Sequence, residues 1–321
     1  MLKPLALSLA VAIGSAQAAT TWNMASPYPD AEFHTQNIKQ FVEDVAENTN
    51  GDIQITLHSG ASLYKAPEIF KAVRSNQIQL GELLVSSLGN DNPIFQVDTL
   101  PFLASDYDDA QKLWAASKPY ITEALKEEGA ILLYTTPWPG QNFYTKEPLT
   151  DAEGLKGKKM RAYNAMTSEI AAKLDAAPTT IEVSDIAQAF STGQIDAMIT
   201  SSATGASSQA WDFVSNYTRV NAWLPKNMIF INQRTWNRLD EATQQAILDA
   251  AAAAEKRGWE MSQEKNANSE AILAENGMNV ADASDALKEK LNDIGHEMAE
   301  AWSAETGEDG AAILDAYRSN Q

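Results

Sequence analysis

The stretch "GLKGKKMRAYNAMTSEIAAKLDAAPTTIEV", residues 154–183, combines a short strand, a helix and a second strand. "KKMRAY" alternates apolar and polar residues as a strand does, "AMTSEIAAKLDA" has the composition of a helix, and "PTTIEV" is again strand-like. A helix "SDIAQAFSTGQ" and a strand "IDAMITSS" follow directly. Because strands alternate with helices of ordinary length, this part of the chain predicts an α/β fold.

The first half of the chain shows the same alternation. "TTWNMA", "DIQITLH" and "IQLGELLVS" are predicted strands, and two predicted helices separate them. We therefore expect two lobes, the first formed by residues 20–142 with about 230–258 and the second by 144–229 with about 259–321. The Ala-rich segment 240–275 should form one long helix that spans both lobes.

The overall charge argues against polyanionic partners. The chain has 43 Asp and Glu residues against 24 Lys and Arg residues, a formal net charge of -19 at pH 7. A protein with this balance repels nucleic acid and anionic lipid alike. We therefore expect no nucleic-acid binding, and we interpret the surface carboxylates as a source of solubility.

The first residues have the features of an export signal. In "MLKPLALSLAVAIGSAQAA" Lys3 precedes an apolar run from Leu5 to Ile13, and Ala16-Gln17-Ala18 fits a cleavage site. Residues 1–18 are thus a predicted signal peptide, and we expect the mature protein in the periplasm. Since no stretch approaches the ~20 apolar residues of a membrane span, we expect no direct membrane insertion.

Recognisable motifs for catalysis and metal binding are missing from the sequence. It has no cysteine, and His34, His58 and His296 lack any paired spacing such as H-E-x-x-H. "TSSATGASS" lacks the flanking glycines of a nucleophile elbow, and "GLKGKK" lacks the spacing of a phosphate-binding loop. We therefore expect no metal, no cofactor and no catalysis, and we interpret each histidine as exposed or hydrogen-bonded. An exported hydrolase or lyase without familiar motifs stays as the alternative to a binding protein.

Arg161 is the candidate for binding a negatively charged ligand. It lies near the C-terminal end of its predicted strand, where open α/β sheets place ligands. A guanidinium offers two parallel donors that match both oxygens of a carboxylate. The residues alone leave a solvated arginine at a strand end as an open alternative. The neighbouring Lys156, Lys158 and Lys159 are interpreted as a solvated turn.

Five segments, in this order and at this spacing, resemble the solute-binding proteins of TRAP transporters, the tripartite ATP-independent periplasmic systems. The segments are "FVEDVAENTNGDIQITLHSGASL", "APEIFKAVRSNQIQLG", "VDTLPFL", "PLTDAEGLKGKKMRAYN" and "LDAAPTTIEVSDIAQAFSTGQIDA". The resemblance implies a two-lobed, type II periplasmic binding protein-like fold with hinge strands and a long helix, closing around one small organic acid. It places the ligand-binding arginine of the family at Arg161.

The same resemblance implies partners for the protein. The bound acid would be handed to a sodium-coupled membrane permease with a small four-helix subunit and a large multi-span subunit. It implies no catalysis and no cofactor. We expect the receptor itself to be a monomer.

The sequence departs from the family pattern at positions that bear on the ligand. Many relatives read Asp-Gly-Gln-Glu-Asn where this chain has "DAMITSS", so Thr200 stands in place of a carboxylate-binding Asn, with Ser201 as a second hydroxyl donor. Relatives that bind sugar acids carry an arginine where this chain has Gln141. In "MASPYPD", where a zwitterion would need a cage, the chain supplies Tyr28. Sugar acids are therefore expected to bind poorly.

Aromatic residues border the predicted cleft instead. Trp138 follows the strand that leads into the second lobe, Tyr163 lies two residues after Arg161, and Trp223 precedes the strand that returns to the first lobe. Such side chains suit the apolar body of a small acid, while core or hinge packing explains each of them equally well. Asn227 is a weaker polar candidate. We expect a compact monocarboxylate with an apolar, aromatic or 2-oxo body.

Overall fold

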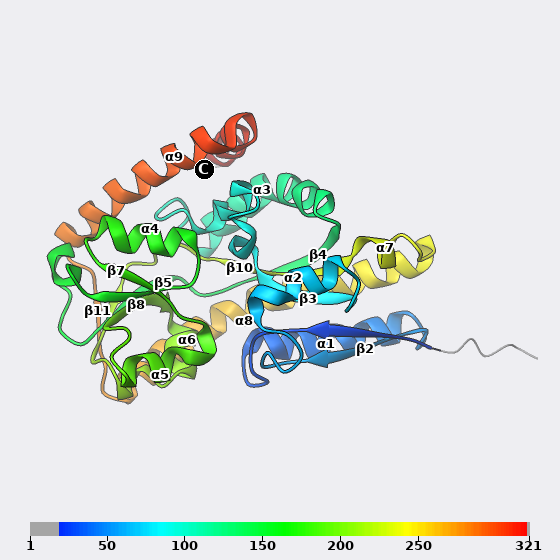
Figure 1. The fold of residues 1–321 in the computed structure, drawn as a ribbon, viewed down its shortest axis with the longest axis horizontal. Coiled ribbons are helices and arrows are strands. Elements are labelled where there is room, and N and C mark those ends of the chain that lie inside the picture. Colours follow the sequence, from blue (N-terminus) through cyan, green and yellow to red (C-terminus); the bar gives the residue numbers. More distant parts are fainter. Residues whose placement is uncertain (1–18, 320–321) are drawn as a thin grey trace, which may run out of the picture.

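The computed structural model describes residues 19–319, so the predicted signal peptide lies outside the described part of the chain. The described residues form two β-sheets, each flanked by helices and each at the centre of one lobe (Figure 1). This arrangement confirms the predicted two-lobed α/β fold.

The first lobe is built on a five-stranded sheet in the order β2-β1-β3-β10-β4. β1 runs parallel to β2 and β3, whereas β10 is antiparallel to both of its neighbours. The strands are β1 (Thr20–Ala25), β2 (Ile53–His58), β3 (Leu80–Leu84), β4 (Ala130–Pro137) and β10 (Lys226–Asn232). The helices are α1 (Phe33–Asn48), α2 (Ala66–Arg74), α3 (Tyr107–Glu127) and α7 (Gln233–Trp236), with 3-10 helices η1 (Val85–Leu88) and η2 (Pro93–Thr99).

The second lobe is built on a six-stranded sheet in the order β11-β9-β5-β8-β6-β7. Its strands are β5 (Gln141–Thr145), β6 (Lys159–Ala162), β7 (Ala177–Thr180), β8 (Ala197–Ser201), β9 (Asn216–Arg219) and β11 (Asn279–Asp282). Its helices are α4 (Ala165–Lys173), α5 (Ile186–Ser191) and α6 (Ser202–Ser207), with 3-10 helices η3 (Ala152–Leu155), η4 (Val183–Asp185) and η5 (Ala210–Asp212). The opening stretch of the sequence thus forms β6, α4 and β7, as predicted.

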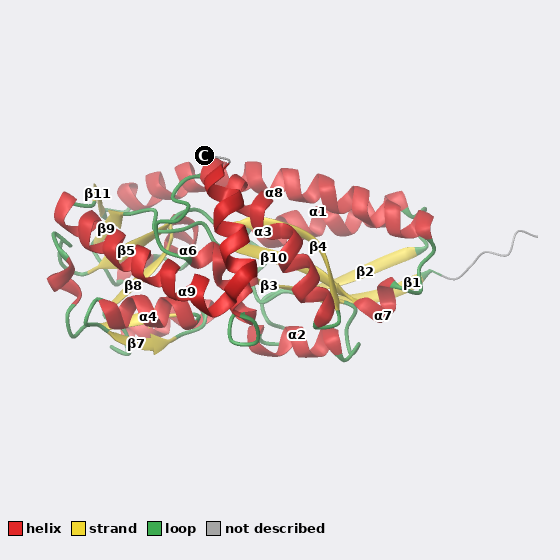
Figure 2. Cartoon of the chain, turned by 90° about the horizontal axis from the view of Figure 1, so that it is seen from above, coloured by secondary structure: helices red, strands yellow, loops and turns green. Residues whose placement is uncertain are grey.

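Three segments connect the lobes. The links from β4 to β5 and from β9 to β10 lie side by side, because Trp138 N donates to Pro225 O at 2.8 Å and Gln141 N donates to Trp223 O at 3.0 Å. The third connection is α8 (Glu241–Glu275), which contacts α1 and β4 in the first lobe and α6 and β11 in the second (Figure 2). The predicted long helix is therefore present and spans both lobes.

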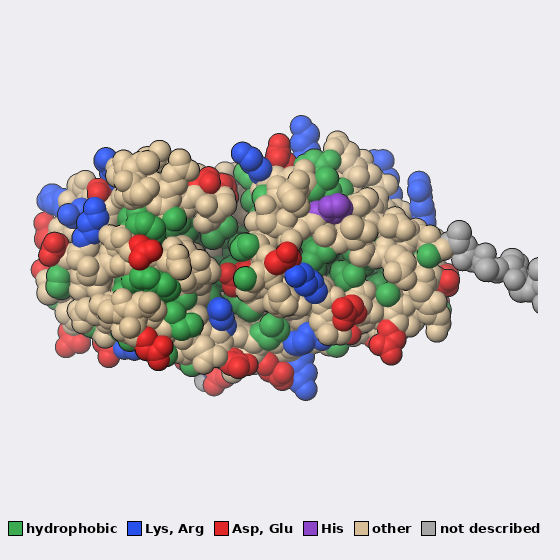
Figure 3. Space-filling view, turned by 90° about the horizontal axis from the view of Figure 1, so that it is seen from below, with side chains coloured by type: hydrophobic (Ala, Val, Ile, Leu, Met, Phe, Trp, Pro, Cys, Tyr) green, Lys and Arg blue, Asp and Glu red, His purple; other side chains and the backbone are tan. Residues whose placement is uncertain are grey.

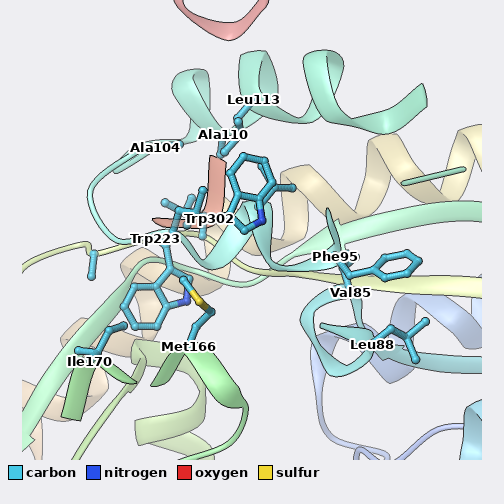
Figure 4. Close-up of a cluster of buried hydrophobic side chains, with 14 of the residues drawn as sticks. Val85, Leu88, Phe95, Ala104, Ala110, Leu113, Met166, Ile170, Trp223 and Trp302 are labelled. Atoms are coloured by element: carbon cyan, nitrogen blue, oxygen red, sulfur yellow. The ribbon is translucent and has the colours of Figure 1, made fainter. Parts of the chain in front are cut away.

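The C-terminal helix α9 (Asp285–Ser319) contacts both lobes, whereas the sequence predicts it in the second lobe only. It packs on α3 and η2 of the first lobe, where Trp302 Nε1 donates to Pro93 O at 2.7 Å. Figure 4 shows Trp302 near Leu113 of α3 in the buried cluster that also contains Trp223. Glu297 also pairs with Lys173 of α4 in the second lobe at 2.7 Å. An apolar helix face does not specify which surface covers it, so the periodicity of this segment could not reveal the contact.

The surface agrees with the acidic composition. Asp and Glu side chains are scattered among Lys and Arg side chains on the face shown in Figure 3, without gathering into one large patch. Within residues 19–319, no helix is both long and apolar enough to cross a membrane.

The packing of α8 on the first sheet gives a test of the fold at Gly258. A Cβ atom at this position would lie 2.4 Å from Thr136 Oγ1 and 2.8 Å from Asn37 Nδ2. We expect Gly258→Ala to lower the free energy of unfolding by about 1–3 kcal/mol through overpacking, although alanine favours a helix by about 1 kcal/mol. Urea denaturation measures the change. In a Thr136→Ala background the penalty should shrink, and a Gly258→Ala protein as stable as wild type would contradict the packing.

Candidate ligand-binding site

A pocket of about 420 Å³ lies between the two lobes. It forms where the C-terminal ends of β1 and β3 in the first sheet face those of β6, β7 and β8 in the second. Its walls include Tyr28, Leu84 and Trp138 from the first lobe and Arg161, Tyr163 and Thr200 from the second. This edge is where open α/β sheets bind ligands.

Arg161 is buried in this pocket without a salt-bridge partner among the described residues. Its side chain is 4% exposed, and its Nε donates to Ile181 O at 2.9 Å. Within residues 19–319 the guanidinium forms no salt bridge, and no hydrogen bond of its Nη atoms is found. Burial lowers the pKa of Arg161 from its ordinary value, while Tyr163, whose ring is centred 5.2 Å from the guanidinium carbon, and the carboxylate of Glu182 partly offset this. The two Nη groups are therefore left for an anionic ligand.

The aromatic residues of the pocket satisfy their polar atoms within the protein. Trp138 Nε1 and Tyr28 OH both donate to Asn227 Oδ1, at 2.9 and 3.3 Å. Tyr163 OH accepts from Trp223 Nε1 at 3.3 Å and donates to Gln141 Oε1, also at 3.3 Å. These side chains consequently offer ring surface, rather than free donors, to a ligand.

The same bonds separate the predicted site residues into two groups. Seven of them line the pocket: Arg161, Thr200, Gln141, Trp138, Tyr163, Tyr28 and Ser201. Trp223 and Asn227 lie behind it, where they hold Tyr163 and the pair Tyr28 and Trp138. Trp223 packs beside Met166 and Ile170 (Figure 4). These two residues therefore support the wall of the pocket from behind and do not line it.

The polar side chains differ in what they have left for a ligand. Ser201 caps α6, since its Oγ accepts from Thr204 N at 3.0 Å and donates to Thr204 Oγ1 at 3.1 Å. Gln141 Nε2 donates to Pro139 O at 2.9 Å. The hydroxyl of Thr200 has no hydrogen bond to any described residue, so it is free to meet a ligand.

Sequence reasoning missed a contact between the lobes at this pocket. Asn164 Nδ2 donates to Ser86 Oγ at 2.9 Å, while Asn164 Oδ1 accepts from Thr167 N and caps α4. Both residues line the pocket, as does the exposed Glu182. Asn164 stands directly before a predicted helix, and an Asn in that position is a capping signal. Its partner in the other lobe, Ser86, is not visible in the sequence.

His34 is neither exposed nor hydrogen-bonded within the described part of the chain, so the interpretation from the sequence is wrong for this histidine. Its side chain is 1% exposed, and its ring centre lies 4.2 Å from that of Trp138. Neither ring nitrogen has a hydrogen-bond partner among the described residues, and burial holds the pKa of His34 well below its ordinary value. His58, by contrast, contacts Asn23 Oδ1 through Nε2 at 2.9 Å. The described part of the chain contains no group of three or more His, Cys, Asp or Glu residues that could hold a metal ion.

Comparison with protein families identifies the architecture. The family described as "Bacterial extracellular solute-binding protein, family 7" matches residues 24–305. The chain belongs to this family. Family 7 solute-binding proteins are the extracytoplasmic receptors of TRAP transporters and not enzymes, so the predicted family is confirmed and the alternative of an exported enzyme is set aside.

Other solute-binding proteins are similar over most of the chain. The DctP7 extracytoplasmic solute receptor of Bordetella pertussis, described as binding pyroglutamic acid, is 44% identical with a TM-score of 0.92, covering 94% of this chain and 100% of that one. A TRAP solute-binding protein from a marine metagenome, specific for pyroglutamate, is 37% identical with a TM-score of 0.92, covering 94% and 99%. A solute-binding protein of Albidiferax ferrireducens is 23% identical over 276 residues, 84% of this chain and 81% of the relative. The protein is thus a TRAP receptor of a small acid.

Proposed function

We propose that this TRAP receptor binds pyroglutamate, or a closely related compact monocarboxylate, in the periplasm. The observation that carries the proposal is Arg161, a buried guanidinium without a salt-bridge partner among the described residues. Among these residues it is the only Lys or Arg that lines the pocket. One guanidinium pairs with one carboxylate, whereas a second carboxylate would be desolvated without a partner. A monocarboxylate therefore fits the charge of the pocket.

The walls of the pocket support a small ring as the body of the ligand. Tyr28, Trp138 and Tyr163 offer ring surface, and a flat five-membered lactam buries its apolar carbons well against such surfaces. The lactam also has one N–H donor and one carbonyl acceptor. The Thr200 hydroxyl can donate or accept, so it suits either atom. Two relatives at 44% and 37% identity that bind pyroglutamate add independent support.

The proposed cellular role follows from the family. The predicted signal peptide would deliver the protein to the periplasm as a monomer. There it would hand its ligand to a sodium-coupled TRAP permease formed by a small four-helix subunit and a large multi-span subunit. Reconstituted transport that requires both a sodium gradient and this receptor would test that role.

Thermal unfolding with a ligand panel tests the proposed specificity. We expect pyroglutamate to raise the melting temperature, because a ligand at 100 times its Kd stabilises the folded state by about 2.7 kcal/mol. The matched control is 2-pyrrolidinone, which keeps the lactam ring but lacks the carboxylate and should have no effect. Aromatic acids, 2-oxo acids, dicarboxylates and galacturonate complete the panel. Stabilisation by galacturonate or a dicarboxylate, with no effect of any compact monocarboxylate, would refute the proposal.

A further inference from the structure

A fully buried carboxylate lies behind the pocket. Glu82 of β3 is 0% exposed, and no Lys or Arg within residues 19–319 forms a salt bridge with it. Ser26 Oγ donates to its Oε2, and Asn227 Nδ2 donates to its Oε1 at 2.7 Å. A buried charge without a cationic partner is destabilising, so we expect Glu82 to have a role beyond packing.

Glu82 is connected to the ligand pocket through Asn227. An ionised carboxylate only accepts hydrogen bonds, so it fixes the Asn227 amide with Nδ2 toward Glu82. Asn227 Oδ1 must then face the pocket side, where it accepts from Tyr28 OH and Trp138 Nε1. With the amide reversed, Nδ2 would face the indole N–H of Trp138, which can only donate, and Oδ1 would face the carboxylate of Glu82, which only accepts. Glu82 thus determines how two walls of the pocket are held.

Two more buried polar side chains near Glu82 have free atoms. His34 Nδ1 lies 3.8 Å from Glu82 Oε1, and neither ring nitrogen of His34 has a partner among the described residues. Tyr134 OH also lacks one there. Glu82 in β3 and Tyr134 in β4 each lie opposite Ile229 of β10, the strand between them. Residues directly opposite each other point to the same face of a sheet, so the side chains of Glu82 and Tyr134 share one face. Glu82 can therefore take up a proton without breaking a salt bridge to Lys or Arg, because it forms none within the described residues.

We propose that Glu82 is a positioning residue of the ligand site, which holds Tyr28 and Trp138 through Asn227 and takes up a proton when the carboxylate ligand binds. The positioning role stands on the geometry above. The proton uptake rests on the proposed function, because it requires the ligand to be an anion.

The charges around Glu82 explain the uptake. Burial raises the pKa of Glu82 to about 7, with Ser26 and Asn227 opposing the rise and Glu32 adding to it. The other groups that face it stay neutral, because burial raises the pKa values of Tyr28 and Tyr134 and lowers that of His34. A second anion in the pocket favours protonated Glu82. Since the carboxylate of the ligand titrates near pH 3.5, affinity should rise as the pH is lowered from 8 to 6.

Two substitutions of nearly equal size separate these roles. Glu82→Gln keeps an oxygen that accepts from Asn227 and an N–H that can donate to Ser26, whereas Glu82→Met keeps the length and removes every acceptor. Calorimetry with pyroglutamate should give a Kd for Glu82→Gln within about threefold of wild type at pH 6, and a Kd for Glu82→Met raised about tenfold or more. Titrations in buffers of different ionisation enthalpy should show proton uptake near pH 7 for wild type and none for Glu82→Gln. Wild-type affinity in Glu82→Met, or unchanged uptake in Glu82→Gln, would overturn the proposal.

A readout without ligand keeps the two proposals distinguishable. The indole N–H resonance of Trp138, assigned with Trp138→Phe, reports its bond to Asn227 in the free protein. It should stay in place in Glu82→Gln and shift in Glu82→Met. If wild type fails to bind pyroglutamate, the proposed ligand is wrong, and this resonance still decides the positioning role. Should Glu82→Met fail to fold, Asn227→Leu breaks the same chain of bonds at its centre, and unchanged binding in that variant would contradict the inference.

Discussion

Arg161→Ala should reduce ligand binding hundreds- to thousands-fold. Removing one partner of a buried, hydrogen-bonded charge pair costs about 3–5 kcal/mol, and every 1.4 kcal/mol is tenfold in Kd. Because Arg161 is the only Lys or Arg lining the described pocket, no neighbouring cation can replace it. Calorimetry with pyroglutamate measures the loss. Arg161→Lys should recover only part of the affinity, since an ammonium does not reproduce the bidentate geometry.

Two controls separate this effect from general damage. Lys158→Ala removes the same charge from an exposed position three residues away and should leave binding unchanged. The unliganded Arg161→Ala protein should be at least as stable as wild type, because burial of the guanidinium is not balanced by a described ion pair. Binding close to wild type in Arg161→Ala would show that the ligand carboxylate lies elsewhere.

The main elements of the fold were predictable because their patterns are local. In β6 the alternation of Met160 and Arg161 indicated that the two side chains point to opposite sides, and the structure places Met160 in the core and Arg161 in the pocket. The burial of Arg161 to 4% exposure was not predictable from that alternation. How deeply a side chain is buried depends on which part of it the opposite lobe covers. The alternation of residues in the strand does not indicate that.

The order of the elements along the chain allowed us to predict which residues lie near the cleft, but not which of them line the pocket. Tyr163 and Trp223 were both predicted there, yet only Tyr163 lines the pocket, while Trp223 supports it from behind. Glu82 and Asn227 are 145 positions apart, and their bond depends on how β3 and β10 pair. Residue type and spacing suggest the chemistry of a side chain, whereas its depth and partners come from tertiary contacts.

The buried pair Asp98 and Lys226 has the largest expected effect on stability. Lys226 begins β10, beside the crossing between the lobes, and its side chain is 1% exposed. Its Nζ lies 3.8 Å from Asp98 Oδ2 and 5.9 Å from the centre of the Trp114 ring, and its backbone N donates to the same oxygen at 2.8 Å. Burial raises the pKa of Asp98 to about 6, and it lowers that of Lys226 from its ordinary value. Each charge thus depends on the other in an environment that disfavours both.

Lys226→Met should lower the free energy of unfolding by about 3–5 kcal/mol at pH 8, because it leaves the Asp98 carboxylate buried with only a backbone donor. The folded pKa of Asp98 is raised above its unfolded value, so the carboxyl contributes stability below about pH 4 that is lost as the pH rises through about 6. Removing Lys226 raises the pKa of Asp98 further, so the decrease in the free energy of unfolding should be smaller at pH 5 than at pH 8.

Urea denaturation at both pH values measures this decrease. The double variant Asp98→Asn with Lys226→Met should recover most of the lost free energy of unfolding at pH 8. A deficit that is equal at both pH values would show that the lost packing of Lys226, rather than the uncompensated carboxylate, accounts for the effect.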